Sequence, residues 1–112
     1  MKTLIIRDII KTRNAILHKF GLEVYSKVKA LIASGEKVTL SFDGLKNVTS
    51  GFCNASVGRI YAEYTNANEL LFLDGIDQNP IWKEKIDNAI ALAKKPDIID
   101  KRNNAISELL KS

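Results

Sequence analysis

The stretch Val38–Tyr64, with the sequence VTLSFDGLKNVTSGFCNASVGRIYAEY, contains the clearest structural pattern in the chain. Val38–Phe42 alternates apolar and polar residues of high β-propensity, which predicts a strand. From Phe52 onward the apolar residues recur at helical spacing instead. They are Cys53, Val57, Ile60, Tyr61 and Tyr64. The stretch therefore predicts a strand, a polar turn at Thr49–Gly51, and a helix over Phe52–Tyr64.

The polar turn is the first candidate for a functional site. Thr49 and Ser50 fall where a helix begins, next to unpaired backbone N–H groups and the positive end of the helix dipole. A hydroxyl at this position can cap the helix, contact an anion or carry a phosphoryl group. Ser50 is the leading candidate for phosphorylation or anion contact, and Thr49 is the second. A plain N-cap is the alternative, and the two roles can coexist.

Two short motifs resemble a known family. They are Ser41-Phe42-Asp43-Gly44-Leu45, at the end of the predicted strand, and Thr49-Ser50-Gly51-Phe52, at the turn. Both are similar to the STAS-like domain of unknown function found in bacteria and phages. That domain is related to the STAS domains of anti-sigma-factor antagonists. Thr12-Arg13, ahead of the first long helix, also looks like the family. The resemblance covers roughly residues 12–94.

The resemblance implies both a fold and a function. The implied fold is a single α/β domain with a mixed sheet covered by helices. The implied function is a non-enzymatic, regulatory protein-interaction module. In the antagonists, the serine that aligns with Ser50 is phosphorylated by a serine kinase of the histidine-kinase ATPase type. The resemblance therefore implies such a partner, docking at Thr49, Ser50, Gly51 and Phe52. Arg13 is a further candidate for anion contact, because a guanidinium pairs with phosphate or carboxylate through two hydrogen bonds, and a plain surface arginine is the alternative.

The remaining pattern predicts alternating strands and helices, which favours parallel neighbours in a sheet covered by helices. Leu70–Leu73 is a short apolar run that suggests a strand covered on both faces. Asn79-Pro80 is typical of a helix N-terminus. The other expected elements are a helix from Gly21 to Ser34-Gly35 and a last helix over residues 97–111. The apolar spacing near the start allows a strand or a helix, and the resemblance implies a strand over Thr3–Ile6.

The composition is that of one soluble globular domain spanning residues 1–112. Hydrophobic residues make up 46% and charged residues 27% of the chain. No apolar run is long enough to cross a bilayer. Lys2, Arg7 and Asp8 interrupt what would be the core of a signal peptide. The single cysteine, Cys53, agrees with a reducing compartment, so we expect a cytoplasmic protein with no membrane partner.

The chemistry-bearing residues do not predict an enzyme. Cys53 lies on the apolar stripe of its helix, which favours a buried thiol over a nucleophile. His18 is the only histidine, and no Cys/His spacing fits zinc. Asp43, Asp74 and Asp77 follow predicted strands, but turn formation explains them more simply. We therefore expect no catalytic residues, no metal and no cofactor.

The net charge of +4 and a pI near 9.2 leave an alternative function open. A small basic protein can bind nucleic acid if its Lys and Arg residues gather on one face. The nearest approach to such clusters is Lys94-Lys95 and Lys101-Arg102. Solvated helix faces explain scattered basic residues as well. The sequence does not predict the oligomeric state.

Overall fold

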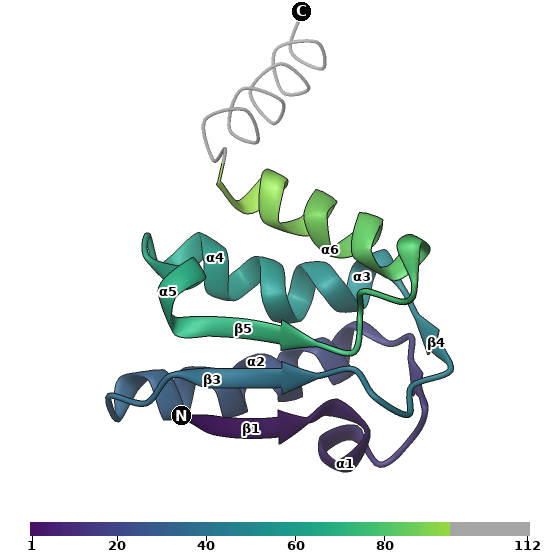
Figure 1. Ribbon diagram of the computed structural model, residues 1–112, viewed down its shortest axis with the longest axis horizontal. Coiled ribbons are helices and arrows are strands. Elements are labelled where there is room, and N and C mark those ends of the chain that lie inside the picture. Colours follow the sequence, from purple (N-terminus) through teal and green to yellow (C-terminus); the bar gives the residue numbers. More distant parts are fainter. Residues whose placement is uncertain (95–112) are drawn as a thin grey trace, which may run out of the picture.

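A computed structural model describes residues 1–94 of the chain (Figure 1). Its main sheet has the strand order β1 (Lys2–Ile5), β3 (Val38–Ser41) and β5 (Leu71–Asp74), and both strand pairs are parallel. Because the strands follow one another in space as they do in sequence, two right-handed crossovers place the connecting helices on the same face of the sheet. The predicted α/β class is confirmed. The resemblance implied a mixed sheet, whereas every strand pair within residues 1–94 is parallel.

The two faces of the sheet differ in burial. Val38, Leu40 and Leu71 point to the helices and are at most 2% exposed. On the opposite face, Phe72 is 38% exposed and its cross-strand neighbour Thr39 is only half-buried. The prediction that both faces of the Leu70–Leu73 run are covered is therefore wrong. The run is apolar on both sides, but the described helices cover only one of them.

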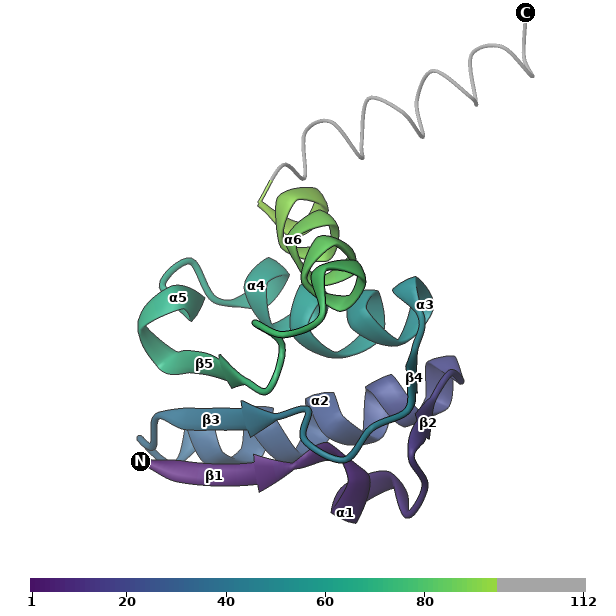
Figure 2. The same cartoon turned by 45° about the vertical axis from the view of Figure 1, so that its right-hand side comes forward.

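A second, two-stranded parallel ribbon extends beyond the carboxyl ends of the main strands. It pairs β2 (Asn14–Ala15) with β4 (Asn47–Val48) (Figure 2). A short helix, α1 (Ile6–Ile10), leads from β1 toward it, and Lys11 ends α1 in the left-handed conformation with φ 62°. The ribbon joins two sequence segments that lie before α2 and before α3. It therefore fixes where those helices begin relative to each other.

Helix α2 (His18–Ala33) begins three residues earlier than predicted, and it packs against the helix that follows the polar turn. That following helix starts at Ser50, two residues before the predicted start. It consists of α3 (Ser50–Cys53), the π-helical turn η1 (Asn54–Gly58) and α4 (Arg59–Glu63). A Cβ atom at Gly21 of α2 would lie 2.6 Å from the Ala55 Cβ atom of η1. Glycine at this position therefore lets the two helices approach each other closely.

Helix α6 (Pro80–Ala93) packs on the other side of the central helix and mainly contacts η1, α3 and α4. Its N-terminus is as predicted, because the Asn79 side chain accepts a hydrogen bond from the Trp82 N–H at 3.2 Å and Pro80 follows the cap. Before it, α5 (Ala67–Leu70) leads directly into β5. The predicted helix over residues 97–111 lies outside the described residues. Within residues 1–94, no helix is long and apolar enough to cross a membrane.

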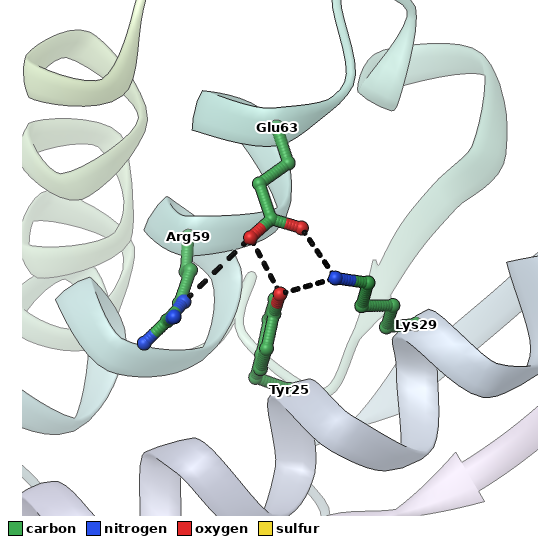
Figure 3. A network of polar contacts seen from close by, with 4 residues as sticks. All are labelled: Tyr25, Lys29, Arg59 and Glu63. Atoms are coloured by element: carbon green, nitrogen blue, oxygen red, sulfur yellow. Dashed lines mark hydrogen bonds and ion pairs between the residues drawn. The ribbon is translucent and has the colours of Figure 1, made fainter.

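A polar cluster connects α2 to α4 at the protein surface (Figure 3). The Tyr25 hydroxyl donates a hydrogen bond to Glu63 Oε1 at 2.5 Å, and Lys29 Nζ lies 3.4 Å from Glu63 Oε2. The guanidinium of Arg59 stacks over the Tyr25 ring at 4.6 Å and also reaches Glu63. The hydrogen bond from Tyr25 is the largest of the effects that lower the pKa of Glu63.

Candidate functional site

Thr49 is the residue that caps the helix after the polar turn. Its hydroxyl oxygen accepts a hydrogen bond from the Phe52 N–H at 3.2 Å and donates one to the Ile16 carbonyl at 3.2 Å. The Thr49 N–H also donates to the Ala15 carbonyl at 3.1 Å. Thr49 therefore holds the helix start against the segment between β2 and α2. The sequence left open a capping role for Ser50, and the structure gives that role to Thr49.

Ser50 is the first residue of α3, and its side chain is exposed. Gly51 is exposed as well, and a Cβ atom there would meet no atom nearer than the Thr49 hydroxyl at 4.0 Å. Phe52 is 0% exposed and belongs to the core. The hypothesis that Phe52 contacts a partner is therefore wrong for this conformation. Ser50 and Gly51 are exposed to solvent, whereas the Phe52 side chain is packed in the core.

Three large apolar side chains are exposed around this turn. Ile16 and Leu17 are 47% and 44% exposed, and they lie in the segment to which Thr49 is hydrogen-bonded. Ile81 is 64% exposed at the start of α6. The ammonium of Lys85, one helical turn after Ile81, donates a hydrogen bond to the Val48 carbonyl at 2.8 Å. This contact brings the first turns of α6 next to the residues that precede Thr49.

We call the surface formed by Ile16, Leu17, Ser50, Gly51 and Ile81 the turn surface. Sequence reasoning identified two of its members, Ser50 and Gly51, and missed the three apolar residues and the neighbouring Lys85. One feature of the sequence marks Ile16 and Leu17. They directly precede α2, at a position where a polar capping residue is usual, and Leu17 makes no side-chain hydrogen bond to the helix. The contribution of α6 depends on tertiary packing, which the local sequence does not reveal.

Arg13 lies at the start of the β2–β4 ribbon, and its side chain is exposed. Its carbonyl accepts hydrogen bonds from the Lys46 and Asn47 N–H groups at 2.7 and 3.3 Å. The Thr12 hydroxyl oxygen accepts a hydrogen bond from the Asn14 N–H at 3.2 Å. The backbone thus holds Arg13 beside Lys46, at the other end of the ribbon from Thr49. Anion contact by the Arg13 guanidinium stays a prediction.

Cys53 is buried, as predicted, with 0% of its surface exposed. Burial raises the pKa of its thiol to about 11, and the nearby Lys85 ammonium opposes this only weakly. A thiol with such a pKa is almost entirely protonated at neutral pH, and the protonated form is a poor nucleophile. His18 is exposed in the first turn of α2. Within the described part of the chain, no group of three or more His, Cys, Asp or Glu residues could hold a metal ion.

Asp43 and Asp77 lie in turns, and Asp74 ends β5 just before a turn, which supports the structural interpretation. Asp43 is followed by Gly44 at φ 82°, and Asp74 is followed by Gly75 at φ 79°, in the conformation that glycine adopts most easily. A Cβ atom at Gly75 would lie 2.5 Å from Asp43 Oδ1, so the two turns are packed together. Asp77 is exposed before α6. That the chain is not an enzyme stays a prediction.

The basic residues named for nucleic-acid binding are largely beyond the described chain. Of Lys94, Lys95, Lys101 and Arg102, only Lys94 lies within residues 1–94. Its ammonium lies over the Tyr61 ring, 5.4 Å from the ring centre. This contact fixes Lys94 near α4, away from the turn surface, and provides no cluster of cations.

Comparison with known proteins gives one match. Residues 21–73 match the family described as the STAS-like domain of unknown function (DUF4325). The matched segment runs from α2 to β5 and contains the polar turn, while Arg13 precedes it. Neither the curated proteins nor the solved structures include a significant match to the chain. The family model thereby confirms, over residues 21–73, the STAS-like domain recognised from the motifs between Ser41 and Phe52.

Proposed function

We propose that this chain is a regulatory protein-interaction module that binds a partner protein through the turn surface, under the control of phosphorylation at Ser50. At the coarse level, a protein-interaction module is what its STAS-like domain suggests. The observation that carries the finer proposal is the exposure of Ile16, Leu17 and Ile81 on the two segments that adjoin an exposed serine. Exposed aliphatic side chains that gather in one place are typical of surfaces that bind other proteins.

The geometry supports Ser50 rather than Thr49 as the modified residue. The Thr49 hydroxyl makes two hydrogen bonds that hold the helix start, so its modification would disrupt the turn. Ser50 is exposed and is not the capping residue. A phosphoryl group on it would add up to about two negative charges beside the apolar contacts. Phosphorylation would therefore change partner binding without requiring any change of fold.

The proposed partner is the kinase itself or a protein that competes with it. The resemblance to anti-sigma-factor antagonists implies a serine kinase of the histidine-kinase ATPase type. Of the five residues of the turn surface, only Ser50 carries a functional group, so none of the other four can serve as its base. The module would act through binding alone.

The test is affinity capture from the native host, followed by binding measurements with the purified partner. Leu17→Ser should weaken binding by about tenfold, because it removes an aliphatic contact from the interface. Leu92→Ser is the matched control, since Leu92 is 38% exposed at the far end of α6. Ser50→Asp should weaken binding, whereas Ser50→Ala should bind normally and no longer respond to the kinase.

All variants must first be compared with the wild type by circular dichroism and thermal unfolding. If folded Leu17→Ser and Ser50→Asp both bind the partner with wild-type affinity, the docking surface lies elsewhere and the proposal fails. Weaker binding by Leu92→Ser alone would move the interface to the end of α6.

A further inference from the structure

The two segments that pair in the β2–β4 ribbon carry positive charge and no carboxylate. The segments 9–22 and 44–58, which the β2–β4 ribbon joins, contain no Asp or Glu. They contain Lys11, Arg13, Lys19 and Lys46, and all four are exposed. On the neighbouring α6, charges of both signs occur, namely Lys83, Glu84, Lys85 and Asp87. The ribbon end of the molecule is therefore basic, whereas α6 is balanced.

Within residues 1–94, no carboxylate neutralises the basic residues at the N-terminus of α2, where the helix dipole disfavours positive charge. The first turn of α2 has no acidic residue and no side-chain cap, although it begins with His18 and Lys19. Cations near a helix N-terminus are repelled by the helix dipole, and carboxylates are favoured there. The three ion pairs found in the described part of the chain all lie elsewhere, at Glu36 and Glu63. Negative groups from another molecule would complement this end of the fold.

From these charges and the exposed aliphatic residues, we infer that the turn surface binds an acidic segment of its partner protein, one that alternates carboxylates with aliphatic side chains. The inference rests on the proposed docking function and adds the chemistry of the partner. Ile16, Leu17 and Ile81 receive the apolar residues of that segment, and Arg13 and Lys46 attract its carboxylates. A phosphoryl group on Ser50 then repels the carboxylates of that segment, so phosphorylation releases the partner.

Nucleic acid is the other polyanion that such a surface could attract, and the apolar residues argue against it. Proteins that bind single strands place aromatic rings under the bases. The exposed side chains of the turn surface are aliphatic, while Phe20 and Trp82 nearby are half-buried. An acidic segment with aliphatic residues can pair with the cations and also pack against the exposed aliphatic side chains, whereas a phosphate backbone can pair only with the cations.

The test selects peptides from a phage-displayed random library on the purified protein, without assuming a partner. We expect the selected peptides to be rich in Asp, Glu, Leu and Ile. Their affinity should fall as salt increases, because exposed charges are screened. Arg13→Glu combined with Lys46→Glu should weaken binding by about tenfold or more. The matched control is Lys2→Glu combined with Lys37→Glu, two exposed lysines at the opposite end of the main sheet.

Amide chemical-shift mapping of the selected peptides separates failure of this inference from failure of the proposed function. Acidic peptides that shift the resonances of Leu17, Ser50 and Ile81 support both. Basic or neutral peptides that shift the same resonances overturn the inference and leave the docking surface in place. Peptides that map to another face overturn both, and so does the absence of any selected peptide. Displacement of bound peptide by a mixed-sequence DNA duplex at physiological salt would favour the nucleic-acid alternative and overturn the inference.

Discussion

At the scale of single residues, the division of roles between Thr49 and Ser50 decides how the turn is interpreted. Thr49 makes the capping hydrogen bond and the bond to the Ile16 carbonyl, while Ser50 is exposed. Thr49→Ala should lower the free energy of unfolding by about 0.5–2 kcal/mol. Ser50→Ala should change it by less than about 0.5 kcal/mol. Urea unfolding of both variants measures the difference, and an equal or larger loss for Ser50→Ala would contradict the assignment of the cap.

Cys53 should be chemically quiet in the folded protein. Its thiol is buried, and its pKa is raised to about 11. A thiol reagent should therefore label it slowly in the native state and rapidly in urea. Fast stoichiometric labelling of the native protein would contradict this and would revive an enzymatic role. Cys53→Ser should destabilise the fold by about 1–3 kcal/mol if the new hydroxyl stays unpaired, and it should leave partner binding intact.

At the scale of elements, the packing of α2 on η1 depends on Gly21. A Cβ atom there would lie 2.6 Å from the Ala55 Cβ atom and 2.8 Å from the Phe52 carbonyl oxygen. Gly21→Ala should therefore destabilise the protein by about 1–3 kcal/mol through overpacking. Gly51→Ala is the matched control, because the space around Gly51 is open and its φ is not positive. That change should be neutral or stabilising by up to about 1 kcal/mol.

Thermal unfolding of the two alanine variants would check this expectation. If Gly21→Ala were as stable as the wild type, α2 could shift away from η1 at little cost. The close approach of the two helices would then not be a requirement of the fold.

The polar cluster between α2 and α4 predicts a pH dependence. The Tyr25 hydroxyl, followed by the charges of Lys29 and Arg59, lowers the pKa of Glu63, although partial burial opposes them. A lowered pKa in the folded state stabilises the fold above the ordinary glutamate pKa of about 4.3, and this contribution is lost as the pH falls through the lowered value. Glu63→Gln should therefore make the loss of stability in acid smaller.

Chemical unfolding at neutral pH and at a pH below the ordinary glutamate range measures this effect. The exposed Glu84, changed to Gln, is the control. An unchanged acid dependence in Glu63→Gln would mean that the cluster does not couple protonation to folding.

The elements show what local sequence could and could not predict. Val38–Phe42 and the helix after the turn were predictable, because period-2 and helical spacing persist over enough residues to be distinctive. The ribbon strands Asn14–Ala15 and Asn47–Val48 are two residues each, which is too short for any pattern. The π-helical turn at Asn54–Gly58 packs closely between α2 and α6, and the residues of these neighbours lie outside that segment.

At the scale of the whole molecule, the candidate site was predictable only in part. Ser50 and Gly51 were found because the family motif marks the turn, while Phe52 was assigned to the surface because sequence position alone does not reveal depth. The apolar members come from two other segments, before α2 and at the start of α6. These segments lie beside the turn because α2 and α6 pack against α3, and the hydrogen bonds of Thr49 with Ile16 and of Lys85 with Val48 hold them there.

The most direct test of the central claim is to ask where the partner touches the protein in the cell. A photoreactive benzoylphenylalanine placed at Leu17, on the turn surface, is compared with the same group at Leu92, on the last turn of α6. After irradiation in the native host, the account predicts a discrete covalent adduct with one partner protein from position 17 and none from position 92. It also predicts that Ser50→Asp abolishes that adduct. A discrete adduct from position 92 with none from position 17 would contradict the claim that the turn surface is the docking site.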